Sequence, residues 1–123
     1  MNNSWYKSVV FNGNQLGRTI GYPTANLDPN VLRKNLKEGV YSCYVDYQNK
    51  LYKGALYFGP RLVLNETKRV LEIYIINFND NIYNKIIKFK LIKFIRGIKT
   101  FPSFEDLKKQ LEEDIQIINN SKF

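Results

Sequence analysis

The sequence contains no histidine and a single cysteine, Cys43. Without histidine, the Ser-His-Asp and Cys-His catalytic arrangements are excluded, and so is every metal site with a histidine ligand. One cysteine forms neither an internal disulfide nor a cysteine-rich zinc site, and its apolar, strand-like surroundings predict a buried thiol. Any chemistry must therefore use carboxylates, lysine, arginine, hydroxyls, backbone groups or a cation bound through oxygen.

Long apolar runs are also missing. No stretch approaches the roughly 18 apolar residues of a membrane span, and the N-terminal residues MNNSWYKSVV lack the apolar centre of a signal peptide. The sequence shows no internal repeat, no low-complexity tract and no linker-like segment. We therefore expect a cytoplasmic protein without a membrane partner, and a single domain over residues 1–123.

The charge is strongly positive, at +8 with a sequence pI near 9.6. Such a surface attracts phosphate groups, whether of a nucleic acid, a nucleotide or a membrane. The chain is also rich in Asn, Ile and Lys, so a compositional bias explains the lysines equally well.

The hydrophobic pattern predicts many strands and one helix. Strand patterns occur at residues 5–11, 39–47, 51–58, 69–78 and 86–95. Residues 12–26 are expected to form a glycine-rich loop, and residues 27–38 an irregular segment with one short helical turn. Apolar residues from Phe104 to Ile118, spaced by three and four, predict an amphipathic helix over about 103–119, with Ser103 as its N-cap. Strands without intervening helices favour an antiparallel sheet, and the length fits a small closed barrel with the helix packed against it.

The segment GRTIGYPTAN, residues 17–26, concentrates residues that shape the backbone. Its glycines and the preceding Gly13 allow a ligand to approach the main chain, and successive N–H groups can form an anion-binding concavity. Arg18 could add a charge at phosphates. The segment is not a Walker loop, because the Gly-Lys-Ser/Thr ending is missing.

Thr24 and Asn26 follow Pro23 in this segment, and in an extended chain their side chains point to the same side. Two neutral oxygen ligands suit Mg²⁺, which takes its charge balance from substrate phosphates. The alternative is a turn in which both side chains satisfy local backbone groups.

Glu72 interrupts an otherwise apolar strand, RVLEIYIINF. Alternation places Leu71 and Ile73 on one face and Glu72 and Tyr74 on the other. A carboxylate on a mostly apolar face must pair, bind a cation or act in function, and one in a pocket could accept the proton of a substrate hydroxyl. The alternative is a solvent-facing residue paired with a neighbouring lysine.

The segment RGIKTF places Arg96, Lys99 and Phe101 just after the last long strand. An aromatic ring beside two cations could hold a flat heterocycle or a phosphate. Equally, it could be a basic loop with one core phenylalanine.

Taken together, Gly13, GRTIGYPTANL, GVY at 39–41, Glu72 in a strand and R-x-x-K-x-F before a C-terminal helix resemble the riboflavin kinase (flavokinase) family. The resemblance runs from about residue 8 to 118. It implies an all-β fold: a six-stranded antiparallel Greek-key barrel with a C-terminal helix packed against it. It also implies transfer of the γ-phosphoryl group of ATP to the ribityl 5′-hydroxyl of riboflavin, giving FMN, in a monomer that binds no nucleic acid.

The resemblance further implies roles for individual residues. Gly13 and Arg18 match positions that touch ATP, and Thr24 and Asn26 match the Mg²⁺ ligands, with Thr24 also on the nucleotide. Glu72 matches the catalytic base. Flavin-side positions near the ring and the product phosphate are matched by four residues: Tyr83, Arg96, Lys99 and Phe101.

The sequence departs from the family in several places. Many bacterial relatives read N-I-G-x-x-P-T-F where this chain has Gly59 but lacks the later Pro-Thr, and Tyr74, Asn77 and Ile98 replace a common His, a common Asp and a usual acid. These relatives carry an FMN adenylyltransferase domain before the kinase domain, for which 123 residues leave no room. We therefore expect a stand-alone kinase domain that, if complete, makes FMN and not FAD.

Two other functions compete with this interpretation. A non-catalytic flavin-binding relative would not need Thr24, Asn26 and Glu72. A small basic nucleic-acid-binding barrel would use KFKLIKF at 88–94, but alternation predicts Phe89 and Leu91 on the buried face, opposite the lysines.

Overall fold

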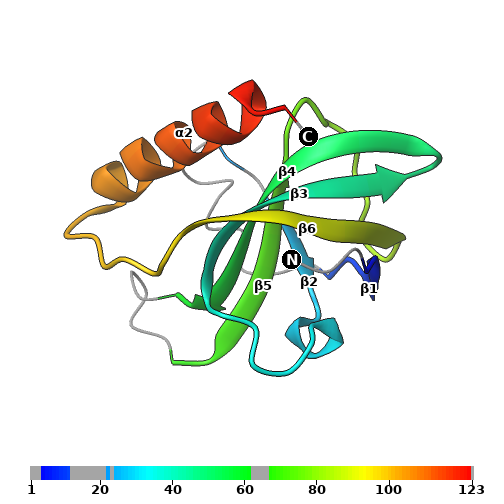
Figure 1. The fold of residues 1–123 in the computed structure, drawn as a ribbon, viewed down its shortest axis with the longest axis horizontal. Helices are drawn as coiled ribbons and strands as arrows, with labels where there is room; N and C mark the ends of the chain where they lie inside the picture. Colours follow the sequence, from blue (N-terminus) through cyan, green and yellow to red (C-terminus); the bar gives the residue numbers. More distant parts are fainter. Residues whose placement is uncertain (1–3, 12–21, 23, 62–66, 123) are drawn as a thin grey trace.

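The computed structural model describes residues 4–11, 22, 24–61 and 67–122. Within these residues the chain forms six strands, one short 3₁₀ helix and one long α-helix (Figure 1). The elements are β1 (Tyr6–Val9), β2 (Ala25–Leu27), η1 (Pro29–Val31), β3 (Gly39–Tyr47), β4 (Lys50–Pro60), β5 (Arg69–Ile75), β6 (Ile86–Arg96) and α2 (Phe104–Asn120).

The strands form one antiparallel sheet in the order β1-β6-β3-β4-β5-β2. The two ends of the sheet approach each other, because the Phe11 amide donates to the Asn26 carbonyl at 2.7 Å just beyond β1. The sheet is therefore a nearly closed barrel, and the predicted antiparallel barrel with a C-terminal helix is confirmed.

The predicted strands are found with small changes at their ends, and β3 has the predicted bounds. The sixth strand, β2, was missed because residues 25 and 26 were assigned to the loop and residue 27 to the irregular segment that follows. Its three residues are all buried, so it offers no alternating pattern to recognise. The alternation expected for β5 and β6 is confirmed: Leu71 and Ile73 point into the core, as do Phe89 and Leu91, whereas Lys88 is exposed.

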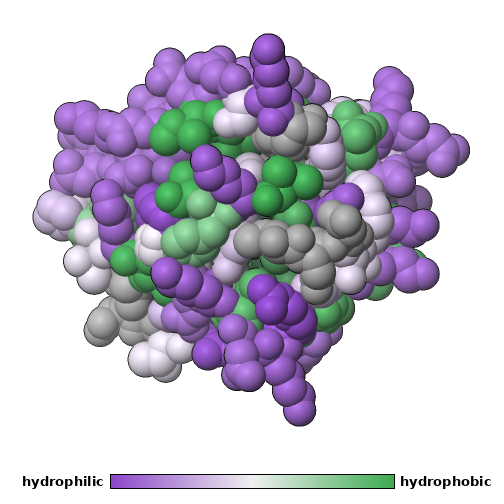
Figure 2. All heavy atoms as spheres, in the orientation of Figure 1, coloured by the Kyte–Doolittle hydropathy of each residue, from purple (hydrophilic) through white to green (hydrophobic). Residues whose placement is uncertain are grey.

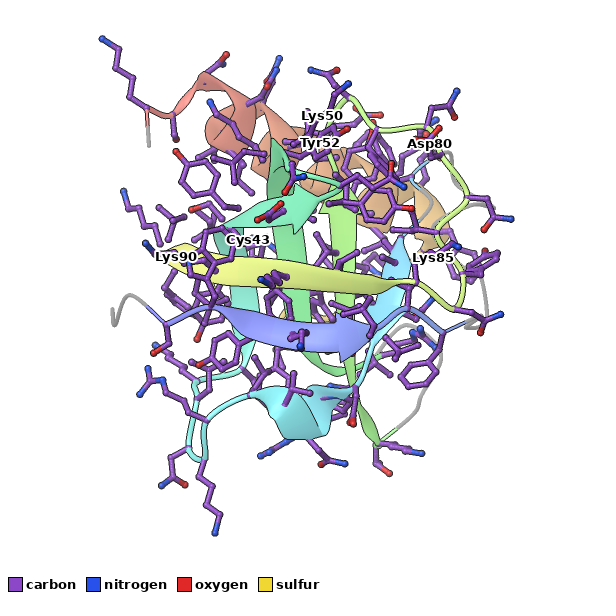
Figure 3. All side chains as sticks on the ribbon, turned by 90° about the vertical axis from the view of Figure 1, so that its right-hand side faces the viewer. Cys43, Lys50, Tyr52, Asp80, Lys85 and Lys90 are labelled. Atoms are coloured by element: carbon purple, nitrogen blue, oxygen red, sulfur yellow. The ribbon has the colours of Figure 1, made fainter. Side chains whose placement is uncertain are left out.

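The core fills the inside of the barrel, with Tyr41, Leu56, Ile73 and Phe89 among its largest buried side chains. Cys43 is also fully buried there, as predicted. Its burial raises the pKa of the thiol. Figure 3 views the barrel from the side of β1 and β6, with Lys85 at the start of β6 and Lys90 farther along it.

Helix α2 lies on the outside of the barrel, across β4 (Figure 1). It begins at the predicted N-cap, where the Ser103 hydroxyl accepts the Asp106 amide at 3.2 Å. Ile118 packs against Ala55 and Ile76 in a second, smaller cluster. Phe104, predicted on the buried stripe, is 45% exposed, whereas Ile115 and Ile118, farther along the helix, pack against the barrel.

Apolar and hydrophilic residues occupy different parts of the surface. Figure 2 shows apolar residues in the middle of one face, bordered by hydrophilic residues along its edges. Among the described residues, no helix has the length and apolar character needed to cross a membrane.

Candidate active site

Three residues lie side by side on three neighbouring strands. Glu72 in the middle of β5 is directly opposite Asn26 of β2 on one side and Tyr57 of β4 on the other. Since residues opposite each other in an antiparallel pair lie on the same face, the three side chains share the face away from the barrel core. The carboxylate predicted from the sequence thus stands between two polar neighbours that come from distant parts of the chain.

Arg61, immediately after β4, joins two of these residues. Its Nε donates to Glu72 Oε1 at 2.8 Å, its Nη2 donates to the same oxygen, and Nη2 also donates to Asn26 Oδ1 at 3.0 Å. The side chains of Arg61 and Glu72 are only 11% and 17% exposed. Glu72 is therefore paired, as a carboxylate on an apolar face must be, but its partner is an arginine and not the lysine considered as the alternative.

Tyr57 fixes the end of β4 next to this pair. Its hydroxyl donates to the Pro60 carbonyl, which places Arg61 at the start of the following segment. Burial, followed by the negative charge of Glu72, raises the pKa of Tyr57 to about 12. The phenol is thus protonated at neutral pH and remains a hydrogen-bond donor.

A pocket opens between this part of the barrel and α2, with about 880 Å³ of space including its open mouth. The pocket brings together five of the residues proposed from the sequence: Thr24, Glu72, Arg96, Lys99 and Phe101. Its remaining walls are mostly aromatic or aliphatic, and include Tyr22, Val40, Leu56, Tyr74, Leu107, Leu111 and Ile115.

Arg96 and Lys99, the two cationic residues of RGIKTF, are held in position by hydrogen bonds to side chains of α2. The Arg96 guanidinium contacts both oxygens of Asp114, at 2.9 to 3.1 Å, and Asp114 is only 1% exposed. Gln110 donates to Asp114 at 3.0 Å and accepts from Lys99 at 3.0 Å. The Arg96 guanidinium also lies 5.9 Å from the centre of the Phe101 ring. A bidentate pair of this kind fixes the orientation of the guanidinium, so the helix sets the position of the cation that faces the pocket.

Tyr83 lies elsewhere. It lines a second cavity with Val10, Ile75 and the segment 78–82, and not the pocket that contains Arg96 and Phe101. Thr24 lines both cavities and marks where they approach each other. Gly13 and Arg18, proposed for the nucleotide, lie outside the described residues.

Sequence reasoning missed Arg61, Tyr57 and Asp114. Asp114 had a usable signal, because it stands within the apolar stripe of the predicted helix, three residues after Leu111 and four before Ile118. A carboxylate there must have a partner. Arg61 and Tyr57 offered no such signal, since their place beside Glu72 depends on the pairing of β4 with β5.

Asn26 and Thr24 are the residues of the site that could hold a divalent cation. The Asn26 amide oxygen already faces a positive group, the Arg61 guanidinium, and Thr24 lies two residues away at the junction of the cavities. Amide and hydroxyl oxygens of this type fit Mg²⁺ when phosphates complete the coordination. No group of three or more acidic, cysteine or histidine residues suited to a metal occurs in the described part of the chain.

Comparison with known proteins decides the family. The family model described as "Flavokinase: Riboflavin kinase" matches residues 2–122. The chain belongs to the riboflavin kinase family. This membership confirms the resemblance drawn from GRTIGYPTANL, Glu72 and RGIKTF.

Individual relatives agree with this assignment. The chain is 37% identical over 108 residues to the bifunctional riboflavin kinase/FMN adenylyltransferase of Haemophilus influenzae, covering 87% of this chain and 35% of that protein. Among solved structures, it is similar to a macrolide-efflux protein from Streptococcus pneumoniae, with a TM-score of 0.83, 30% identity, and coverage of 98% of this chain and 40% of that one.

A second solved structure, riboflavin kinase from Trypanosoma brucei, has a TM-score of 0.62 at 22% identity, covering 94% of this chain and 77% of that chain. At that identity the likeness shows a common fold. The chain spans about a third of the Haemophilus influenzae protein that it matches.

Proposed function

We propose that this member of the riboflavin kinase family transfers the γ-phosphoryl group of ATP to the ribityl 5′-hydroxyl of riboflavin, giving FMN and ADP. One observation carries the proposal: Glu72 faces the same pocket as Thr24, Arg96 and Phe101, beside apolar walls that suit a flat ring. A phosphoryl transfer needs a positioned hydroxyl, a base and charge neutralisation close together, and this pocket offers residues for each.

The flavin ring would lie against Phe101 and the aliphatic side chains of α2, with Arg96 and Lys99 near its polar edge or the product phosphate. Glu72 would then accept the proton of the 5′-hydroxyl as this oxygen attacks the γ-phosphorus, while ADP leaves.

Thr24 and Asn26 would hold Mg²⁺ through their side-chain oxygens. When bound, the cation neutralises charge on the phosphates. The second cavity meets the first at Thr24, so it is the natural place for the nucleotide, with the phosphates directed at Thr24. This placement favours a nucleotide-side role for Tyr83 over the flavin-side role expected from the sequence. Gly13 and Arg18 remain proposed nucleotide contacts.

We also infer that the partners are riboflavin and ATP and not a nucleic acid. In the segment KFKLIKF that a single-strand binder would use, Phe89 is buried in the core and cannot stack on a base. The ring beside Lys90 is that of Trp5 on a neighbouring segment. The single domain, the monomeric state and the cytoplasmic location remain predictions from the sequence.

The proposal is tested by incubating the purified chain with riboflavin, ATP and Mg²⁺ and separating the flavins by chromatography. We expect an FMN peak that disappears with excess EDTA and returns when Mg²⁺ is added beyond the chelator. Riboflavin binding without FMN would identify a non-catalytic flavin binder. A folded protein that does not bind riboflavin at all would overturn the proposed function.

A further inference from the structure

Arg61 lies between two residues of the candidate site, although no role was predicted for it from the sequence. The family pattern N-I-G-x-x-P-T-F prescribes no residue type at position 61. Even so, this guanidinium connects the residue proposed as base, Glu72, to a residue proposed as metal ligand, Asn26. All three side chains are largely buried.

The contact with Asn26 competes with a metal ion. Asn26 Oδ1 accepts from Arg61 Nη2 at 3.0 Å, whereas a bound Mg²⁺ would take the same oxygen at about 2.0–2.1 Å. A guanidinium has donors only and is always charged. Two cations at the same oxygen repel each other strongly, so the guanidinium and the metal cannot both bind Asn26.

The contact with Glu72 does not conflict with the metal in the same way. Both guanidinium contacts fall on a single carboxylate oxygen, Oε1. The backbone at Arg61 is anchored by the bond from Tyr57 to the Pro60 carbonyl. A rotation of the side chain alone is therefore enough to release Asn26, and the strands need not move.

We propose that Arg61 is a positioning residue whose guanidinium occupies the position of the divalent cation at Asn26 while that cation is absent. In the substrate-free protein it holds Asn26 and Glu72 in the arrangement that catalysis needs, and it leaves Asn26 when the divalent cation binds. This inference rests on the proposed function, because it requires Asn26 to be a metal ligand.

The test compares binding of the Mn²⁺ complex of a non-hydrolysable ATP analogue to wild type, Arg61→Gln and Arg69→Gln, measured by the change in its EPR signal. Arg69 is a matched control, because it also pairs with a glutamate, Glu38 at 2.6 Å, but is 62% exposed. Removing the competing cation should tighten Mn²⁺ binding about three- to tenfold in Arg61→Gln. Arg69→Gln, with the same change of net charge, should match wild type.

A merely structural role for Arg61 would not tighten metal binding, so unchanged or weaker binding in Arg61→Gln overturns the proposal. Failure of both wild type and Arg61→Gln to bind Mn²⁺ overturns it as well. Asn26→Ala separates this result from the proposed function. If Asn26→Ala leaves Mn²⁺ binding unchanged, the metal site itself is wrongly placed; if it weakens binding and Arg61→Gln does not tighten it, only the role of Arg61 fails.

A second measurement follows the wild-type protein, and a variant serves only to assign one signal. The Arg61 Nη2–H signal in a ¹⁵N NMR spectrum, assigned by its absence in Arg61→Lys, reports the bond to Asn26. During a Mg²⁺ titration in the presence of a non-hydrolysable ATP analogue it should shift with the same saturation as the Asn26 side-chain amide. An Asn26 amide that shifts while the Arg61 signal stays fixed would contradict displacement.

Discussion

Asp114 illustrates how a single buried charge organises the pocket. It lies on α2, is 1% exposed, and meets Arg96 of β6 with both of its oxygens. The pair connects the helix to the strand end that faces the pocket. Because a charge left alone in such a place is costly, the two residues depend on each other.

Asp114→Asn should therefore destabilise the protein by about 3 kcal/mol, since it leaves the Arg96 charge buried without its counter-charge. Urea unfolding followed by circular dichroism measures the change in the free energy of unfolding. Glu113→Gln is the matched control on the exposed side of the same helix, and should change it by less than about 0.5 kcal/mol. Equal, small effects of the two substitutions would contradict the structural role of the pair.

The elements differ in how well the sequence predicted them. β3 and α2 were found nearly residue by residue, because their patterns are long and their ends carry Gly39 and Ser103. β2 was not predicted, because three buried residues are too few to show an alternating pattern and a glycine-rich segment precedes them. The contact between Arg61 and Asn26 joins residues 35 positions apart. It arises only because β2 and β4 both pair with β5, and no local pattern encodes such pairing.

The same limit applies to the candidate site. Its residue types came from motifs, since Thr24, Glu72 and RGIKTF are recognisable along the chain. The partners of these residues could not be predicted from the sequence, because Asp114 contacts Arg96 only once α2 packs on the barrel. Tyr83, predicted on the flavin side with Arg96 and Phe101, lines another cavity, because its place between the motifs in sequence does not determine which cavity it faces.

Gly39 shows how an element positions the site. Its φ of +153° is one that residues with side chains rarely adopt, and an added Cβ would lie 2.3 Å from the Arg96 carbonyl oxygen. Gly39→Ala should thus lower the free energy of unfolding by about 3 kcal/mol or more through backbone strain and overlap. Gly97→Ala, where the added Cβ meets nothing within 4 Å, is the matched control and should be nearly neutral. A mild Gly39→Ala variant in thermal and urea unfolding would contradict the close approach of β3 and β6.

At the scale of the whole molecule, the pocket is made by parts of the chain that are far apart in sequence. The barrel supplies Glu72 and Tyr57, the segment before β2 supplies Thr24, and α2 closes the opposite side with Leu107 and Leu111. None of these parts forms a site alone. The pocket therefore requires the folded barrel together with its helix.

The most direct test of the account asks whether Glu72 acts in chemistry and not in binding. Riboflavin binding, followed by quenching of flavin fluorescence, and FMN formation with ATP and Mg²⁺ should be measured on the same samples of wild type, Glu72→Gln and the surface variant Glu38→Gln. We predict that Glu72→Gln binds riboflavin within a few-fold of wild type but forms FMN at least about 100-fold more slowly, while Glu38→Gln matches wild type in both. A Glu72→Gln protein that turns over at the wild-type rate would contradict the account.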